Sequence, residues 1–193
     1  MHSPTLTIVS GFGRCGSSLV MQMLAAGGYP TVGEYPAYEV EAPEVLTEAF
    51  LAAHDGMAIK VLDLHVYPLP VGPAYRVIWL DRDYRQQARS MAKFLGATVG
   101  ACFDRADLGK LKRSYAADRP KVFAALFRMG ARVLPLRFEL LVGAPNTAAL
   151  RLAQFLGGGL DVEAMPFWKS AGISRTGSRI ESRNTVSLRI RTI

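Results

Sequence analysis

Cysteine and histidine are scarce in this chain, and the few that occur are widely separated. Among 193 residues there are two cysteines, Cys15 and Cys102, too far apart in sequence for a disulfide framework or a metal-ligand spacing. This usage agrees with a reducing compartment. His2, His54 and His65 are dispersed as well, and they form neither a metal-ligand set nor a catalytic triad. We therefore expect no bound metal.

Long apolar runs are also missing. Half of the residues are apolar, but no uninterrupted stretch approaches the roughly 20 residues that cross a membrane. The first residues, MHSP, lack the basic region and apolar segment of a signal peptide. We therefore expect a cytoplasmic protein with no membrane partner, folded as one domain of residues 1–193 around one core.

The charge is unbalanced. The formal net charge of +7, from 23 Lys and Arg against 16 Asp and Glu, makes a polyanionic partner such as nucleic acid worth considering. Five arginines gather in 175–191, however, and five glutamates without a base occupy 33–48. Nucleic-acid binders interleave basic and aromatic residues over one face, and this pattern is absent. We expect no nucleic-acid partner.

The most informative stretch is Ser10–Ser18, SGFGRCGSS. It follows a short apolar run, Leu6–Val9, and it opens a run over 19–24 with helical apolar spacing. Strand, glycine-rich turn and helix start are typical of a phosphate-binding loop, in which backbone N–H groups and the positive helix end hold an anion. Ser17 and Ser18 can cap the helix and donate hydroxyl protons to phosphate oxygens.

This loop departs from the nucleoside triphosphate consensus G-x-x-x-x-G-K-[ST] at one position. Gly11–Ser18 fits it except that Ser17 replaces the lysine, and the basic residue lies three places earlier, at Arg14. A kinase uses the lysine on the outer phosphates, whereas an arginine suits a bidentate grip on one tetrahedral anion. A degenerate nucleotide or nucleoside kinase, with Asp81 in place of a Walker B aspartate, is the alternative. A purely structural glycine turn is another.

Strands and helices are expected to alternate along the rest of the chain. Strands are predicted at Ala58–Leu62, Tyr75–Leu80 and from Val133, and helices at Pro43–Ala53, from Asp83 and at Lys121–Met129. Tyr75–Leu80 is apolar on both faces apart from Arg76, which is typical of a central parallel strand beneath helices. The basic stretch Asp104–Arg119 is predicted to be mobile.

A second polar stretch, Asp81–Ser90, follows the apolar strand. Asp83 is a natural N-cap, so Arg82 should lie at the carboxyl end of a strand beside a helix start, the edge at which open α/β sheets bind ligands. Ser90 comes eight residues after Arg82. The alternative is that Arg82 pairs with Asp81 or Asp83 and that Ser90 lies on a solvated face.

Together the two stretches resemble the sulfotransferases that use 3′-phosphoadenosine 5′-phosphosulfate (PAPS). That family carries P-[KR]-S-G-T-[TS] after its first strand, where it binds the 5′-phosphosulfate, and Gly13–Ser18 reads GRCGSS. It also binds the 3′-phosphate with an Arg and a Ser eight residues later, as with Arg82 and Ser90. Residues 133–157 match its strand, its Tyr-Glu-x-Leu segment and its terminal Phe-Leu-Gly. Gly13 for the usual proline and Cys15 for the usual serine are departures.

The resemblance implies a fold and a reaction. The fold is a three-layer P-loop-like α/β domain, a parallel sheet flanked by helices, with its core over about 5–157 and a basic C-terminal segment at 170–193. The reaction is in-line transfer of a sulfuryl group from PAPS to a hydroxyl or amine of a small-molecule or carbohydrate acceptor, without a metal, releasing adenosine 3′,5′-bisphosphate (PAP). The implied donor-binding residues are Gly11, Gly13, Arg14, Cys15, Gly16, Ser17, Ser18, Arg82, Ser90 and Arg175.

Arg14 is also expected to take part in the chemistry, because with the loop amides it would stabilise the charge on the leaving oxygen. Several residues compete as the base. Glu34, in a Gly-Glu pair like that of one branch of the family, is the first candidate and Glu39 the second. Another branch uses Lys-Thr-His, for which Lys60 and the displaced His65 are weaker matches. A non-catalytic nucleotide-binding or anion-binding module remains a further alternative.

Overall fold

Four parallel strands form the centre of the protein in the computed structural model, which describes residues 5–40 and 46–166. They are β1 (Thr5–Gly11), β2 (Ala58–Lys60), β3 (Ala74–Asp81) and β4 (Arg132–Arg137), in the order β2-β1-β3-β4. β1 pairs with β3 from Thr5 opposite Ala74 to Gly11 opposite Leu80. The predicted central strand is therefore confirmed, and β1 is the other inner strand.

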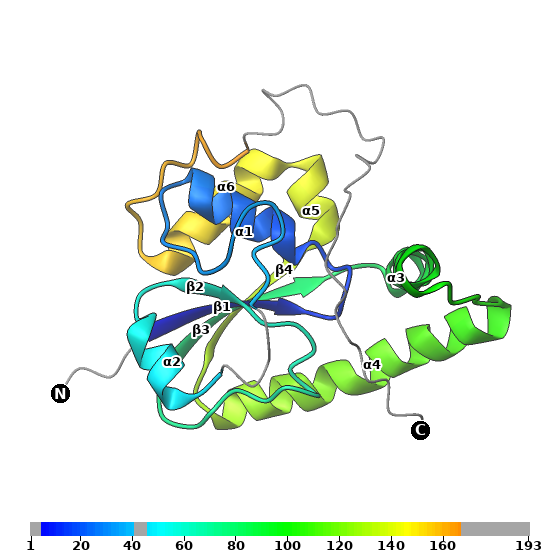
Figure 1. Cartoon of the computed structure of the whole chain (residues 1–193). Helices are drawn as coiled ribbons and strands as arrows, with labels where there is room; N and C mark the ends of the chain where they lie inside the picture. The colour runs from blue at the N-terminus through cyan, green and yellow to red at the C-terminus, as the bar shows by residue number, and fades with distance from the viewer. Residues whose placement is uncertain (1–4, 41–45, 167–193) are drawn as a thin grey trace.

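Helices cover both faces of this sheet. They are α1 (Ser17–Ala26), α2 (Glu48–Ala53), α3 (Tyr84–Val99), α4 (Arg105–Arg128), α5 (Phe138–Gly143) and α6 (Pro145–Leu156). Figure 1 shows α1, α5 and α6 on one face of the sheet and α2 and α4 on the other, with α3 next to α4. The expected three-layer α/β arrangement is confirmed. Within the described residues, no helix has the length and apolar character needed to span a membrane.

The side chains of the inner strands alternate between two apolar layers. In β3, Val77 and Trp79 belong to the cluster that includes the buried residues of α4, whereas Ile78 and Leu80 belong to the cluster formed with α1, α5 and α6. Successive side chains of a strand point to opposite faces. A strand buried on both faces must therefore be apolar almost throughout, which is why the run at 75–80 was informative.

Helix α4 differs from the prediction. A mobile segment at Asp104–Arg119 was expected before a short helix, but one helix covers Arg105–Arg128. The helix begins with a capping box at Asp104. The carboxylate of Asp104 accepts a hydrogen bond from the N–H of Asp107 at 2.8 Å, and the carboxylate of Asp107 accepts one from the N–H of Asp104 at 3.4 Å. The numerous lysines and arginines obscured the apolar side chains that pack at helical spacing against the sheet, namely Leu108, Leu111, Tyr115, Val122 and Leu126.

Helix α2 is shorter than predicted. It begins at Glu48, because the hydroxyl of Thr47 accepts a hydrogen bond from the N–H of Phe50 at 3.2 Å and caps the helix there. The described residues before it, Leu46 and Thr47, are not helical. The predicted start at Pro43 lies outside the described residues.

Candidate functional site

The glycine-rich loop joins β1 to α1 at the carboxyl edge of the sheet. Its backbone turns through positive φ at Gly11 (157°), Arg14 (67°) and Gly16 (102°). Gly16 is the N-cap of α1, no side chain caps this helix, and its first turn contains no acidic residue. The positive end of the helix dipole therefore faces no carboxylate of the first turn. This is the backbone arrangement by which phosphate-binding loops hold an anion.

Gly11 is required by close packing at the start of the loop. A Cβ at this position would lie 2.7 Å from the carbonyl oxygen of Leu80 and 2.7 Å from the Sγ of Cys15. The carbonyl belongs to the neighbouring inner strand, so it cannot move without disturbing the pairing of β1 with β3. The residue thus serves the sheet as well as the loop.

We expect Gly11→Ala to lower the free energy of unfolding by about 1–3 kcal/mol, the usual range for a residue forced into a sparsely populated conformation. Urea denaturation monitored by circular dichroism measures this difference. Gly143→Ala is the matched control, because a Cβ there meets no atom within 4 Å, and it should leave stability unchanged or raise it. Equal unfolding free energies for Gly11→Ala and the natural chain would contradict the packing argument.

Arg14, Ser90 and Arg82 meet at this loop although they come from distant parts of the sequence. The Nε of Arg14 lies 3.5 Å from the Oγ of Ser90, and the Nη1 of Arg82 donates to the carbonyl oxygen of Arg14 at 3.0 Å. The guanidinium of Arg14 lies over the ring of Phe94 at 5.0 Å, and that of Arg82 lies over Phe138 at 4.2 Å. Two oriented guanidinium groups and a hydroxyl therefore border the loop.

The surroundings of Arg82 suit an anion. Among the described residues, its buried Nε has no hydrogen-bond partner. Burial lowers the pKa of Arg82, the carboxylate of Glu139 opposes this change, and the charge of Arg14 lowers the pKa further. A buried donor without a partner and two repelling cations are both costly. A bound anion would satisfy the donor and offset the repulsion, so the residues present fit a phosphate group.

Asp81 pairs with Arg119 and not with Arg82. Arg119 donates from Nε to Oδ1 at 2.8 Å and from Nη2 to Oδ2 at 2.6 Å, and the indole N–H of Trp79 donates to Oδ1 at 2.9 Å. The alternative in which Arg82 is the partner of Asp81 is therefore wrong. Both oxygens of Asp81 are engaged, so a Walker B role would require it to leave Arg119. The predicted N-cap is confirmed, since Asp83 accepts from the N–H of Gln86 at 2.9 Å.

Gln87 stabilises the loop, and it is not among the site residues predicted from the sequence. Its buried side-chain amide donates from Nε2 to the carbonyl oxygens of Phe12 at 2.8 Å and of Gly13 at 3.0 Å. Helix α3 thus fixes the backbone of the loop through Gln87. The sequence offers no signal for it, because nothing in the polar run at the start of this helix distinguishes Gln87 from Gln86.

Lys60, at the end of β2, connects the loop to the acidic stretch. Its side chain is 2% exposed, and its Nζ donates to the Oγ of Ser18 at 3.2 Å, to the Oε1 of Glu39 at 2.6 Å and to the carbonyl oxygen of Ala37 at 2.5 Å. Three acceptors satisfy a buried ammonium group. Two predicted site residues, Lys60 and Glu39, are therefore in contact, and one carboxylate oxygen of Glu39 is occupied.

The remaining predicted residues lie in different surroundings. Glu34 is exposed, and His65 is exposed with its Nε2 3.9 Å from the Oδ2 of Asp118 on α4. Cys15 is buried, and burial raises the pKa of its thiol to about 11, so it is neutral at physiological pH. Arg175 lies outside the described residues. In residues 5–40 and 46–166, no three His, Cys, Asp or Glu side chains are grouped as a metal site requires.

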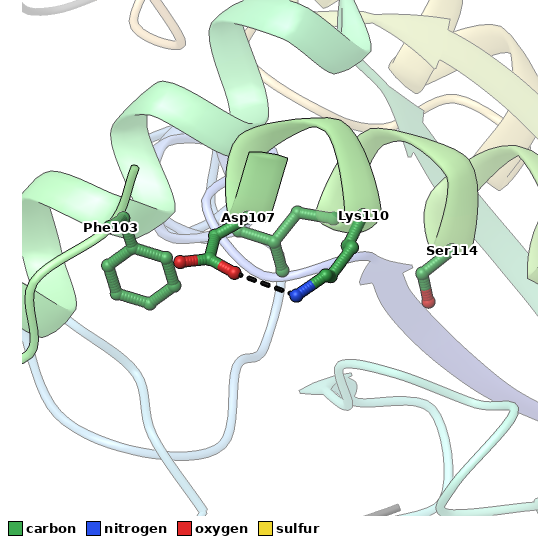
Figure 2. A pocket seen from close by; sticks show the side chains of 5 residues that line it. Phe103, Asp107, Lys110 and Ser114 are labelled. Atoms are coloured by element: carbon green, nitrogen blue, oxygen red, sulfur yellow. Dashed lines mark hydrogen bonds and ion pairs between the residues drawn. The ribbon is translucent and has the colours of Figure 1, made fainter. Parts of the chain in front are cut away.

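Two cavities differ in their position relative to the loop. One of about 150 Å³ lies beside Lys60 and is lined by Glu39, Val40, Leu46, Lys60, Val61, Leu62, Asp63 and Tyr67. The other, of about 290 Å³, lies along α4 and is lined by Phe103, Asp107, Lys110, Leu111 and Ser114 (Figure 2). There Lys110 is paired with Asp107 at 3.1 Å. Only the first cavity includes predicted site residues.

No protein-family model matches this chain, and a comparison with curated protein sequences finds no match either. Solved structures with a similar fold include retinol dehydratase with retinol and PAP, at a TM-score of 0.52 and 13% identity over 88% of this chain and 65% of that protein. Retinol dehydratase with androsterone and the inactive cofactor PAP has a TM-score of 0.53 and 15% identity, over 88% of this chain and 64% of that protein. Mouse sulfotransferase SULT7A1 with PAP has a TM-score of 0.59 and 12% identity, over 89% of this chain and 64% of that protein.

The chain thus spans about 64–65% of the length of these structures. At 12–15% identity the likeness shows the fold, which is sulfotransferase-like. The predicted three-layer P-loop-like α/β fold is therefore confirmed.

Proposed function

We propose that this chain is a PAPS-dependent sulfotransferase that transfers a sulfuryl group to a hydroxyl or amine of a small-molecule or carbohydrate acceptor. The observation that carries the proposal is the meeting of Arg14, Arg82 and Ser90 at a glycine-rich loop whose helix start is uncapped. The fold adds support, because the similar structures described above were solved with PAP.

Each group at the loop has a role in this proposal. Arg82 and Ser90 bind the 3′-phosphate, and the loop amides with Ser17 and Ser18 bind the 5′-phosphosulfate. PAPS supplies an activated sulfuryl group whose leaving group is the nucleotide 5′-phosphate. Arg14 stabilises the negative charge that develops on the leaving oxygen. Lys60 donates to the Oγ of Ser18 and so orients this hydroxyl at the loop.

The cavity beside Lys60 is the proposed acceptor site. Lys60 lines the cavity and donates a hydrogen bond to the loop residue Ser18. The rest of the lining contains apolar side chains and two carboxylates, Glu39 and Asp63. Small ligands bind in mostly apolar cavities that contain a few placed polar groups. Retinol and androsterone, which occupy complexes of the fold-related retinol dehydratase, are small molecules of this general kind.

Thermal unfolding with nucleotides tests the donor assignment. PAP at 100 times its dissociation constant should add about 2.7 kcal/mol to stability, which raises the melting temperature of a chain of this size by roughly 5–11 °C. We expect this shift with PAP in the absence of magnesium, and a much smaller shift with ADP.

Two other outcomes would replace the proposal. A larger shift with ATP and magnesium than with PAP would favour the degenerate kinase. A PAP shift without sulfuryl transfer to any hydroxyl or amine in an acceptor screen would favour a nucleotide-binding module. No shift with any nucleotide would contradict the proposed enzyme while leaving the fold as described.

A further inference from the structure

Asp63 is a carboxylate of the proposed acceptor cavity, and it has no close cationic partner among the residues that the structure describes. Both Asp63 and Glu39 line this cavity. Glu39 is bound to Lys60 at 2.6 Å, whereas in the described part of the chain no Lys, Arg or His nitrogen comes within 4.0 Å of the Asp63 carboxylate. The N–H of Gly13 interacts with this carboxylate, and its remaining lone pairs have no cationic partner among the described residues.

The backbone holds Asp63 at the junction between the cavity and the phosphate-binding loop. Its N–H donates to the carbonyl oxygen of Gly11 at 3.1 Å, and its own carbonyl accepts from the N–H groups of Val66 and Tyr67 at 2.7 and 3.1 Å. Its φ is +55°, in the left-handed region that non-glycine residues seldom adopt. Residues held in such conformations cluster at active sites, since the surrounding structure must stabilise them.

The burial of Asp63 favours proton uptake by its carboxyl. Burial raises the pKa of its carboxyl, while His65 and the N–H of Gly13 oppose this change. Cys15 and Tyr115 are the other titratable groups that interact with it, and both are neutral at physiological pH because burial raises their pKa values to about 11 and about 12. Lys60 and Glu39 also line the cavity, and they are paired with each other at 2.6 Å.

The other candidates for the base are less well placed. Glu34 is exposed and does not line the cavity. His65 also lies outside the lining and faces Asp118 on α4. Glu39 lines the cavity but has one oxygen bound to Lys60, and its side chain is 65% exposed. Position and availability together favour Asp63.

We infer that Asp63 is the catalytic base for a small, mainly apolar hydroxyl acceptor bound in this cavity, an inference that rests on the proposed sulfotransferase function. The acceptor O–H proton passes to a carboxylate oxygen of Asp63 while the acceptor oxygen forms a bond to sulfur. The bond between sulfur and the bridging oxygen of the nucleotide breaks, and that oxygen keeps the electron pair as part of the 5′-phosphate. Asp63 then releases its proton to water.

The size and lining of the cavity point to a phenol-like acceptor. Four of its lining side chains are aliphatic and one is aromatic: Val40, Leu46, Val61, Leu62 and Tyr67. A cavity of about 150 Å³ has the volume to hold a molecule the size of benzene. Phenols are therefore suitable probes, and they have the further advantage that ring substituents vary the acidity of the hydroxyl without changing its position.

The test compares Asp63→Asn with the natural chain in two measurements. Transfer from radiolabelled PAPS is followed with phenol, whose hydroxyl is protonated near neutral pH, and with p-nitrophenol at a pH where it is ionised. Loss of a general base costs about 10²–10⁴-fold in rate, so this loss is expected with phenol, and p-nitrophenol should be sulfated within about tenfold of the natural rate because it needs no base. The PAP-induced rise in melting temperature should be unchanged.

The controls separate this inference from the donor assignment. Glu48→Gln removes an exposed carboxylate outside the site and should change neither measurement. Equal losses with phenol and p-nitrophenol, or loss of the PAP-induced shift in Asp63→Asn, would assign Asp63 a structural role at the loop and overturn the inference. PAP binding without sulfation of either phenol by the natural chain would also overturn it, while leaving the donor site intact. Failure of the natural chain to bind PAP would instead contradict the proposed function itself.

Discussion

Arg14→Ala is expected to slow sulfuryl transfer about 10²–10³-fold, the usual cost of losing one group that stabilises transition-state charge. The guanidinium lies at the loop, stacked over Phe94 and beside the hydroxyl of Ser90. A group held by its surroundings needs little reorganisation when charge develops on the leaving oxygen. The rate is measured as transfer from radiolabelled PAPS to p-nitrophenol, an acceptor that does not depend on a base.

Two further variants show whether geometry or charge alone is responsible. Arg14→Lys keeps the positive charge but loses the planar fork that binds an anion through two N–H groups, so an intermediate rate is expected. Arg85→Ala removes an exposed arginine of α3 outside the site and should leave the rate unchanged. Residue 14 has a positive φ, which is equally unfavourable for alanine, lysine and arginine because all three have a Cβ. The substitutions therefore do not change the backbone strain of the loop. A rate for Arg14→Ala close to the natural one would contradict the assigned role.

The parts of the site that the sequence predicted are those encoded over short distances. The loop is specified by a strand, glycines and a helix start within Ser10–Ser18, so its turn through positive φ angles follows from local backbone preferences. Arg82 and Ser90 were predicted because they follow a recognisable inner strand, Arg82 directly after β3 and Ser90 within α3. Parallel strands end at the same edge of a sheet, which explains why these residues reach the loop.

The parts that were not predicted depend on contacts between distant segments. The partner of Asp81 is Arg119, which belongs to α4, and Gln87 acts through carbonyl oxygens of the loop. A sequence gives the identities of such side chains but not the positions that select one partner among several. For Asp63, the informative features are a positive φ and a cavity, and neither has a signal in the residue types around it.

Helices α2 and α4 differ from the prediction because tertiary contacts determine where they begin and what stabilises them. The many charged residues of α4 predict a mobile segment, yet Tyr115, Val122 and Leu126 are buried, and Leu108 and Leu111 are partly buried in the same apolar cluster. Tertiary packing of one apolar face stabilises most helices, so the composition of the exposed face is a poor guide. The start of α2 lies later than predicted because the cap is formed by the hydroxyl of Thr47, and a proline at 43 is an equally good helix start in sequence.

Arg82→Ala is expected to weaken binding of PAP by about 10–150-fold, which corresponds to the roughly 1.5–3 kcal/mol of a hydrogen bond to a charged group. Binding of AMP, which lacks the 3′-phosphate, should change far less. The physical reason is that the buried Nε of Arg82 has no hydrogen-bond partner in residues 5–40 and 46–166, and that its guanidinium lies over Phe138, so both can contact a phosphate group. Isothermal titration calorimetry of the two nucleotides with the natural and altered chains gives the ratio of the losses.

The difference between the loss of PAP affinity and the loss of AMP affinity is more informative than either loss alone, because Arg82 also stabilises the loop. Its Nη1 donates to the carbonyl oxygen of Arg14, so removing it could disturb the binding of any nucleotide. Arg82→Met retains an extended stem against Phe138 and lacks only the charged hydrogen-bonding group, and it should show the same preference for losing PAP. Ser90→Ala should share that preference with a smaller loss, because a neutral hydrogen bond contributes less than a charged one. Equal weakening of PAP and AMP in both Arg82 variants would mean that Arg82 acts only on the loop, and the 3′-phosphate would then have to be bound elsewhere.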